Sequence, residues 1–185
     1  MSFIHDLVKL DELSAKTEEG KRLYQTPQGK SYPSVTTVTG ILSKDDIQAW
    51  RIRIGEEKAD QITRAATSRG NKVHKLAELY LRNELFSQST LFDEPKTNNY
   101  KMFEVLSSVL DNKVGVVRAI EAPLYSDVLR VGGRVDLVAE WDNELAVIDF
   151  KTSSKPKKEH WIDNYFMQSS AYAFMFEELT KISIN

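Results

Sequence analysis

Two aspartates and a lysine stand out in this sequence because they occupy positions where a buried strand would carry apolar residues. Asp136 lies within the segment GGRVDLVAEW, and Asp149 lies within the segment ELAVIDFKTS. Lys151 follows Asp149 at a spacing of two, which in a strand points both side chains to the same face. Whether the three groups can act together depends on how the two segments pair.

The turn between the two segments sets their register. Asp142 and Asn143 both tolerate a positive φ angle and predict a two-residue hairpin turn. Directly paired side chains in such a hairpin share one face, with Cβ atoms about 4.5–5.5 Å apart. The predicted pairs are Trp141 with Glu144, Asp136 with Asp149, and Arg134 with Lys151.

The opposite face of this hairpin is apolar throughout in the same register. A buried face specifies strand register strongly, because a slip of one residue would turn every apolar side chain outward. The residues of this face are Val135, Leu137, Ala139, Ala146, Ile148 and Phe150.

Two carboxylates about 5 Å apart repel each other by roughly 3 kcal/mol at an effective dielectric constant near 20, so they need a compensating cation. A divalent metal is suitable, because Mg²⁺ prefers oxygen ligands in octahedral geometry. A bound metal lowers the pKa of water and stabilises charge on a phosphate oxygen. Lys151 could orient or deprotonate the attacking water, or stabilise the transition state. The pattern therefore predicts metal-dependent phosphodiester hydrolysis.

An alternative interpretation needs no metal. Asp136 could form an ion pair with Arg134 or Lys151 on an exposed strand face. The metal hypothesis also depends on the turn, because a three-residue loop would break the pairing of the two aspartates. An unrelated α+β protein would be favoured if Asp136 and Asp149 faced opposite sides of the sheet.

The elements that position these residues can be read from the hydrophobic period. From Val114 the pattern alternates and predicts strands over residues 114–126, 129–141 and 144–153. Helices are predicted before them over residues 35–42, 47–63, 67–85 and 100–112, and after them over residues 161–179. Ser34 is the expected N-cap of the first helix, which should end near Gly40. Residues 181–185 are expected to begin a further strand.

The N-terminal region is harder to read. Residues 1–20 are mixed and acidic, and they predict a poorly ordered or peripheral arm. Residues 22–34 predict a small hairpin, with turn chemistry at Pro27, Gln28 and Gly29. We expect one domain over residues 1–185: an arm and hairpin (1–31), a helical elaboration (32–113), and a catalytic sheet with its following helix (114–185).

The composition is that of a globular protein of 185 residues, 41% hydrophobic and 28% charged. The net charge of −2 gives no basic footprint of a nucleic-acid partner, and the absence of cysteine excludes disulfides and thiolate metal sites. The first residues lack a signal-peptide pattern, and the longest apolar run, AYAFMF, is far shorter than a membrane span. We expect a cytoplasmic protein without a membrane partner.

Several motifs in the right order resemble those of the PD-(D/E)XK nuclease superfamily. GGRVDLV followed by VIDFKTS is similar to its paired motifs, with Asp136 as the first acid and Asp149-Phe150-Lys151 as the D-x-K. RGNKVHKLAELYL, EAPLY and QSSAY resemble motifs of the RecB-like exonuclease branch, matched here by His74, Glu121, Gln168 and Tyr172. YPSVTTVTGIL resembles a segment of phage nucleases and of relatives of the mitochondrial genome maintenance exonuclease.

This resemblance implies a restriction-endonuclease-like α+β fold: a central mixed sheet with an antiparallel meander, flanked by helices, and an N-terminal helical elaboration that helps to form a passage for a DNA strand. It implies Mg²⁺ or Mn²⁺ as cofactor, with Glu121 as a further metal or water ligand. Gln168 and Tyr172 would contact the DNA backbone or support Lys151. The metal ligands that it implies are His74, Asp136, Asp149 and the main-chain carbonyl of Phe150.

Basic and aromatic residues near this site are candidates for DNA binding, because lysine and arginine contacts to phosphate add sequence-independent affinity. The alternative is an ordinary solvated surface or, for Trp50, core packing. The basic candidates are Arg69, Lys155, Lys157 and Lys158, with Arg51, Arg53, Arg64 and Lys72 on the helical segment. Trp50, Trp161 and Tyr32 could stack on the bases of a single strand.

The first functional hypothesis is a DNA exonuclease dependent on Mg²⁺ or Mn²⁺ that prefers single-stranded or frayed ends. A structure-specific endonuclease, which would need a dimer or an open groove, is an alternative with the same chemistry. A non-catalytic DNA-binding module is the rival from another class, and the complete acid–acid–lysine set disfavours it. We expect a monomer that serves DNA replication or repair in a bacterial or phage-infected cell, with a helicase or single-strand-binding protein as a conceivable partner.

Overall fold

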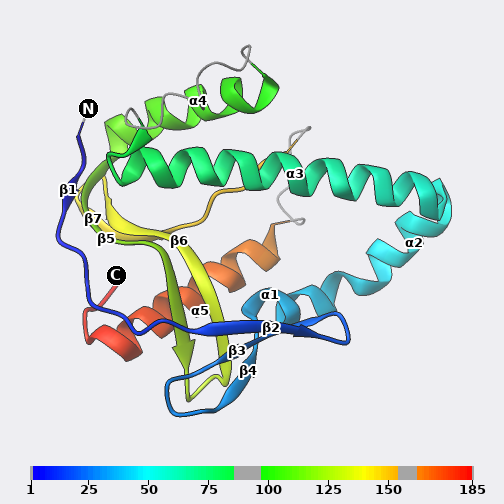
Figure 1. The fold of residues 1–185 in the computed structure, drawn as a ribbon, viewed down its shortest axis with the longest axis horizontal. Helices are drawn as coiled ribbons and strands as arrows, with labels where there is room; N and C mark the ends of the chain where they lie inside the picture. The colour runs from blue at the N-terminus through cyan, green and yellow to red at the C-terminus, as the bar shows by residue number, and fades with distance from the viewer. Residues whose placement is uncertain (1, 86–96, 154–161, 185) are drawn as a thin grey trace.

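The computed structural model describes residues 2–85, 97–153 and 162–184 (Figure 1). Its centre is a four-stranded sheet with the strand order β1-β5-β6-β7. β5 (Val114–Ser126), β6 (Val131–Trp141) and β7 (Glu144–Ile148) form an antiparallel meander, and β1 (Ile4–His5) pairs with β5 in parallel. The predicted α+β fold with a central mixed sheet is confirmed.

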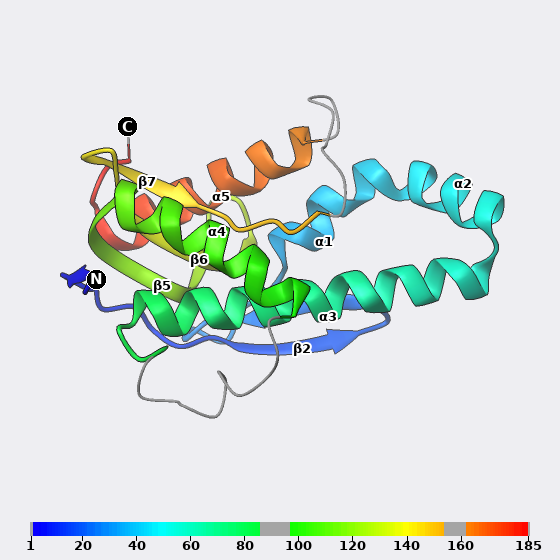
Figure 2. The same cartoon turned by 90° about the horizontal axis from the view of Figure 1, so that it is seen from above.

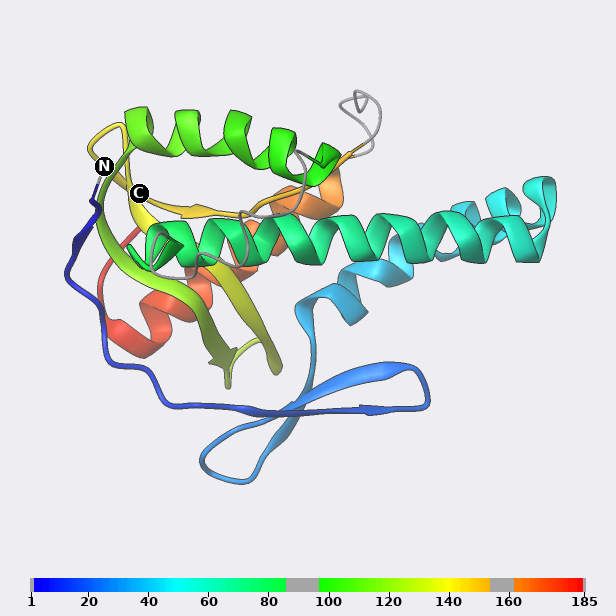
Figure 3. The same cartoon turned by 45° about the horizontal axis from the view of Figure 1, so that its top comes forward.

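Helices cover both faces of this sheet (Figure 3). α3 (Glu56–Leu81) and α4 (Asn98–Lys113) lie on one face, and α5 (Asp163–Thr180) lies on the other. The apolar residues that recur at helical spacing along α3 are buried: Val73, Leu76, Ala77, Tyr80 and Leu81. The described helices include none that combines the length and the apolar character needed to cross a membrane.

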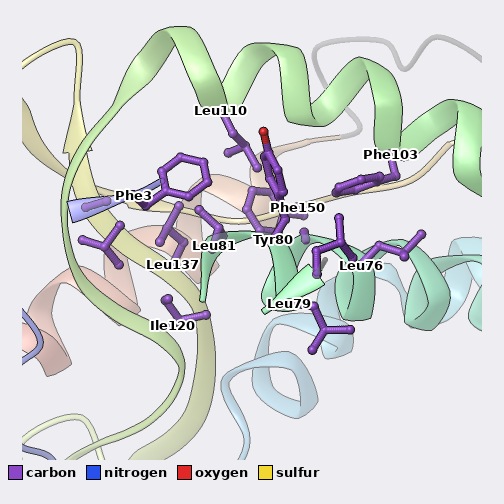
Figure 4. Packing of buried hydrophobic residues seen from close by; sticks show 14 residues of the cluster. Phe3, Leu76, Leu79, Tyr80, Leu81, Phe103, Leu110, Ile120, Leu137 and Phe150 are labelled. Carbon is purple, nitrogen blue, oxygen red and sulfur yellow. The ribbon is translucent and has the colours of Figure 1, made fainter. Parts of the chain in front are cut away.

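Two apolar clusters hold these layers together. The first joins α3 and α4 to the sheet and contains Tyr80, Phe103, Leu110, Leu137 and Phe150 (Figure 4). The second joins α5 and α1 (Val35–Thr39) to the other face. Its members include Val35, Val135, Val138, Tyr172, Met175 and Phe176.

The apolar face predicted for the β6–β7 hairpin is divided between these clusters. Leu137 and Phe150 lie in the first cluster, whereas Val135 lies in the second. The change occurs beside Glu121 of β5, whose φ angle of 46° departs from strand geometry. Both β5 and β6 curve along their length (Figure 1), so strict alternation does not continue through this point.

A second, smaller sheet is hydrogen-bonded separately from the first and has the order β2-β3-β4. Its strands are β2 (Ser14–Glu18), β3 (Lys21–Gln25) and β4 (Ser31–Pro33). The predicted hairpin is confirmed as β3 and β4, which pair antiparallel with Tyr24 opposite Tyr32. The predicted cap is also confirmed, because the Ser34 hydroxyl accepts a hydrogen bond from the Thr37 N–H at 2.9 Å.

The helix boundaries of the N-terminal half differ from those predicted. After α1 the chain continues through a short 3-10 turn, η1 (Gly40–Ser43), into α2 (Lys44–Ile54). The break that we placed between residues 63 and 67 lies instead at Gly55, which adopts a φ of 87°. α3 then runs unbroken for 26 residues and includes Gly70. α2 and the first half of α3 extend away from the sheet (Figure 2).

Three other expectations were wrong. Residues 1–20 are not a peripheral arm, because Phe3 is buried and Ile4 and His5 pair with Val116 and Val117. A strand of two residues is too short to show the alternation that would predict it. Pro123 lies inside β5, which runs to Ser126 instead of ending at Glu121 as a strand-ending Ala122-Pro123 would require, and residues 181–184 form no strand. β1 pairs with β5 only at two residues, so Pro123 can lie where β5 has a strand neighbour on one side.

Candidate active site

A cavity of about 560 Å³ lies where α3, the curved part of β5 and β6, α5 and the small sheet meet. It brings together residues that are up to 150 positions apart in the sequence, Arg22 and Tyr172. Seven of the residues predicted from the sequence line it: His74, Glu121, Asp136, Asp149, Lys151, Gln168 and Tyr172.

Asp136 is the buried acid at the centre of this site. The β6–β7 pairing follows the predicted register from Trp141 and Glu144 as far as Leu137 and Ile148, around a turn in which Asp142 and Asn143 have positive φ. Beyond Ile148 the main-chain ladder stops, and the Phe150 N–H donates to Asp136 Oδ2 at 2.7 Å. The Asp136 carboxylate therefore accepts the hydrogen bond that a main-chain carbonyl of β6 would accept in a continued ladder. This bond holds the segment after β7 beside Asp136.

The end of the ladder changes one predicted pair. Arg134 does not face Lys151, because the paired part of β7 ends three residues earlier. Its guanidinium instead donates to the main-chain oxygen of Glu121 and lies 3.7 Å from a carboxylate oxygen of Glu12. The ion pair of Asp136 with Arg134 or Lys151 that needed no metal is absent from the described residues.

His74 reaches the site from α3, and its two ring nitrogens have different partners. Nε2 lies 2.8 Å from the Phe150 carbonyl oxygen, which can only accept, so Nε2 carries a proton. Nδ1 lies 3.3 Å from Asp136 Oδ1 and 3.9 Å from Glu121 Oε1. The hydrogen bond with Asp136, followed by that with Glu121, raises the pKa of His74 to about 10, against the opposing effect of burial.

Glu121 completes this group from the neighbouring strand. Its neighbours Ile120 and Ala122 pair with Leu137 and Val135, so Glu121 lies opposite Asp136. The positive φ of Glu121 is unusual for a residue with a side chain and interrupts the regular geometry of β5. Here it accompanies a carboxylate directed toward His74 rather than toward solvent.

Asp149 and Lys151 form the second part of the site, just beyond the end of β7. The Lys151 ammonium contacts Asp149 Oδ2, and it also lies 5.2 Å above the centre of the Tyr165 ring. The Asp149 side chain is only 7% exposed. Burial raises the pKa of Asp149, and the charge of Lys151 opposes this rise.

Gln168 and Tyr172 extend from α5, one helical turn apart, and support Asp149. Gln168 Nε2 donates to Asp149 Oδ1 at 3.1 Å and approaches the Tyr172 hydroxyl at 3.4 Å. Gly133 of β6 makes room for this arrangement, because a Cβ at that position would lie 2.5 Å from a ring carbon of Tyr172. Burial also raises the pKa of Tyr172.

Comparison with known proteins identifies this arrangement. The sequence profile described as the PD-(D/E)XK nuclease superfamily matches residues 48–183. The chain belongs to this superfamily. Asp136, Asp149 and Lys151, the residues of the predicted motifs, lie within the matched range and line one cavity.

The similar curated proteins are all named mitochondrial genome maintenance exonuclease 1. The human protein is 30% identical over 135 residues, the mouse protein 28% over 138, and the Xenopus tropicalis protein 32% over 116. The alignments cover 68%, 70% and 60% of this chain but only 38%, 39% and 32% of these relatives. The chain therefore spans well under half of their length.

PD-(D/E)XK nucleases use divalent metals, and the side chains present here fit one. One ligand atom each from His74, Glu121 and Asp136 lies within 4.8 Å of the others. Octahedral ligands at about 2.0–2.1 Å from Mg²⁺ lie about 3–4 Å apart. Small movements of the three side chains would therefore bring their ligand atoms to metal-binding distances. Because Nε2 donates a hydrogen bond to the Phe150 carbonyl oxygen, Nδ1 is the nitrogen that faces the two carboxylates. In metal-binding histidines, the ring nitrogen that does not bind the metal typically donates to a carbonyl oxygen in this way.

The predicted metal ligands are thus not equivalent in this structure. His74 and Asp136 lie in the cluster with Glu121, whereas Asp149 is engaged by Lys151 and Gln168. The Phe150 carbonyl accepts the hydrogen bond of His74. Their roles as metal ligands remain predictions.

The predicted DNA-binding residues are only partly described. Lys155, Lys157, Lys158 and Trp161 lie outside the described residues. Arg69 is half-buried on α3, and its Nε has no hydrogen-bond partner among the described residues. Tyr32 is buried and donates its hydroxyl to Asp127, so its ring is not available for stacking.

Sequence reasoning missed two groups of cavity residues. Arg22, Tyr24, Ser34 and Thr36 come from β3 and the start of α1. Thr67 and Asn71 come from α3, on the same side of the helix as His74. Helical spacing from His74 could have found the second group. No sequence signal joins the first group to the site, because the contact between the small sheet and β6 is long-range.

Proposed function

We propose that this protein is a metal-dependent DNA exonuclease that acts on single-stranded or frayed ends. The main observation that supports this proposal is that one cavity brings together two groups of residues. The first group is His74, Glu121 and Asp136, and the second is Asp149 and Lys151. The exonuclease names of the relatives support the reaction class, although they belong to longer proteins.

Each side chain has a distinct task in this proposal. His74, Glu121 and Asp136 would hold Mg²⁺ or Mn²⁺, and the Phe150 main chain orients two of them through its N–H and carbonyl. When bound, such a metal polarises a phosphate oxygen and lowers the pKa of water. Lys151 can donate hydrogen bonds to the phosphate or to the attacking water. Gln168 fixes the Asp149 carboxylate that positions Lys151.

The depth of the site supports a single strand as substrate. The side chains of Asp136 and Asp149 are only 11% and 7% exposed. The cavity is bounded by helices on two sides and by the small sheet on a third. A scissile phosphate must reach the acids between these walls, which is easier for a flexible strand than for a stiff duplex.

The test uses end-labelled single-stranded DNA, duplex DNA and covalently closed circles, with Mg²⁺, Mn²⁺ or EDTA. We expect metal-dependent shortening of linear strands only, abolished in Lys151→Ala. Cutting of closed circles would favour the structure-specific endonuclease. Binding without any cleavage would favour a non-catalytic DNA-binding module.

A further inference from the structure

Within the part of the chain that the structure describes, one cation of the cavity forms no ion pair with a carboxylate. Among the described residues, Lys75 pairs with Glu78, Lys151 pairs with Asp149, and Arg134 lies near Glu12 and binds the Glu121 carbonyl. Arg22 of β3 also lines the cavity, and no described carboxylate lies within ion-pair distance of it. An unpaired guanidinium beside a phosphodiester-hydrolysing site has the charge and the donors that a phosphate requires.

Arg22 is held in place by an aromatic side chain. Its guanidinium carbon lies 5.2 Å above the centre of the Tyr24 ring, on the same face of β3. Tyr24 is itself only 4% exposed. Stacking leaves the in-plane N–H groups of a guanidinium free to donate. The contact with Tyr24 therefore orients Arg22 without using its hydrogen-bond donors.

Tyr24 in turn is fixed to the catalytic sheet. A Cβ on Gly132 of β6 would lie 2.8 Å from the Tyr24 Cβ, so glycine permits this close packing. Ser34 at the end of the small sheet also bridges to Gly132. Gly132 is four residues from Asp136 along β6, so the position of Arg22 is tied to the strand that carries the central acid.

Arg22 also lies outside the part of the chain that the superfamily profile matches. The superfamily profile begins at residue 48, whereas the small sheet occupies residues 14–33. This sheet therefore adds a wall and a cation to a site whose reacting groups all lie within the profile region.

We propose that Arg22 binds a backbone phosphate of the substrate strand at the mouth of the active site, so that the small sheet serves as a phosphate clamp. This inference rests on the proposed function only in taking a nucleic-acid strand as the ligand. A planar guanidinium makes two parallel hydrogen bonds to a phosphate, which lysine cannot reproduce. Arg22 thus contributes to substrate binding and not to the chemical step.

The experiment measures binding of a fluorescent single-stranded oligonucleotide in EDTA, from 50 to 200 mM salt, for wild type, Arg22→Ala, Arg22→Lys and Lys21→Ala. Lys21 is the matched control, because it is the adjacent cation of β3 and alternation points it to the other face. Thermal melting of each variant checks that the fold is retained. Steady-state cleavage with Mg²⁺ separates KM from kcat.

We expect Arg22→Ala to weaken binding about tenfold and to lower the slope of log affinity against log salt by about 0.7, the value for one single-strand phosphate contact. Arg22→Lys should recover the slope but only part of the affinity. Lys21→Ala should bind as wild type does, and Arg22→Ala should raise KM with little change in kcat.

Equal binding and equal salt slopes for Arg22→Ala and wild type would overturn the clamp, as would an equal loss in Lys21→Ala. If wild type binds DNA but never cleaves it, the proposed function fails and the binding data still decide the role of Arg22. If wild type cleaves and Arg22→Ala has an unchanged KM, the clamp alone fails. If wild type does not bind the oligonucleotide at all, both fail.

Discussion

The two sheets of this protein meet at one cavity but are built differently. β5 and β6 of the catalytic sheet have 13 and 11 residues, and helices bury both faces. The strands of the small sheet have three to five residues, and every residue of β2 is exposed. The proposed catalytic and metal-binding groups belong to the first sheet and to the helices packed on it, whereas the proposed phosphate clamp belongs to the second.

The difference indicates where positional accuracy is needed. Groups that act on the reacting atoms must be held to a fraction of an ångström, which a buried sheet and packed helices provide. A phosphate contact tolerates more displacement, so a short sheet anchored at Tyr24 and Gly132 suffices. Damage to the first sheet should therefore lower kcat, and damage to the second should raise KM.

The largest effect is expected when an acid of the proposed site is neutralised, in comparison with an acid of the β5–β6 turn that contacts the small sheet. Asp149→Asn keeps the shape of the side chain but removes the charge paired with Lys151, and we expect kcat to fall about 10²–10³-fold. Asp127→Asn is the matched control, since Asp127 joins the small sheet through Lys30 and Tyr32. Steady-state assays on single-stranded DNA should show little change in the kcat of Asp127→Asn. Equal losses in both variants would contradict the division.

Adjacent glycines of β6 give the next sharpest comparison. Gly133→Ala would place a Cβ 2.5 Å from a Tyr172 ring carbon and displace the helix residues that support Asp149. We expect kcat to fall about 10–100-fold with KM nearly unchanged, because small misplacements at a reacting centre have large effects. Steady-state kinetics would measure kcat and KM, and the melting temperature of the variant would show that its fold is retained. A change confined to KM would count against the role of Gln168 and Tyr172.

Gly132→Ala should act on the other region. Its Cβ would lie 2.8 Å from the Tyr24 Cβ and push the small sheet away from β6. We expect KM to rise about five- to tenfold while kcat changes less than twofold, because the acids and Lys151 are not displaced. A loss of kcat as large as that in Gly133→Ala would show that the two sheets do not act separately.

The smallest effect is a pH dependence of stability in metal-free protein. The pKa of His74 is raised to about 10 by Asp136 and Glu121, above the ordinary value of 6.5. The stabilisation from its charge is therefore complete below pH 6.5 and is lost as the pH rises through about 10. Denaturant unfolding in EDTA should show wild type losing stability relative to His74→Gln between pH 6 and pH 10. A difference independent of pH would contradict this.

Much of the catalytic sheet could be predicted from the sequence. Asp142 and Asn143 fixed a two-residue turn, and the apolar alternation fixed the register as far as Leu137 and Ile148. The motif that includes His74 placed that residue beside the acids. These signals are local, since turn chemistry and strand period are set by neighbouring residues.

What could not be predicted depends on long-range contact. The positive φ of Glu121, which accompanies the curvature of β5, has no local marker, because glutamate rarely adopts it. The parallel strand at Ile4 and His5 is recognisable only once β5 is in place. The approach of Arg22 to the site depends on the packing of Tyr24 against Gly132, 108 positions further along the chain.

The central claim is that His74, Glu121 and Asp136 form a divalent-metal site at the bottom of the cavity. Calorimetric titration of Mn²⁺ into wild type and Asp136→Asn, without DNA, tests it most directly. We predict saturable binding to wild type and at least about 100-fold weaker binding to Asp136→Asn, whose melting temperature without metal should stay close to wild type. Equal Mn²⁺ affinity in the two proteins, or no binding to either, would contradict the account.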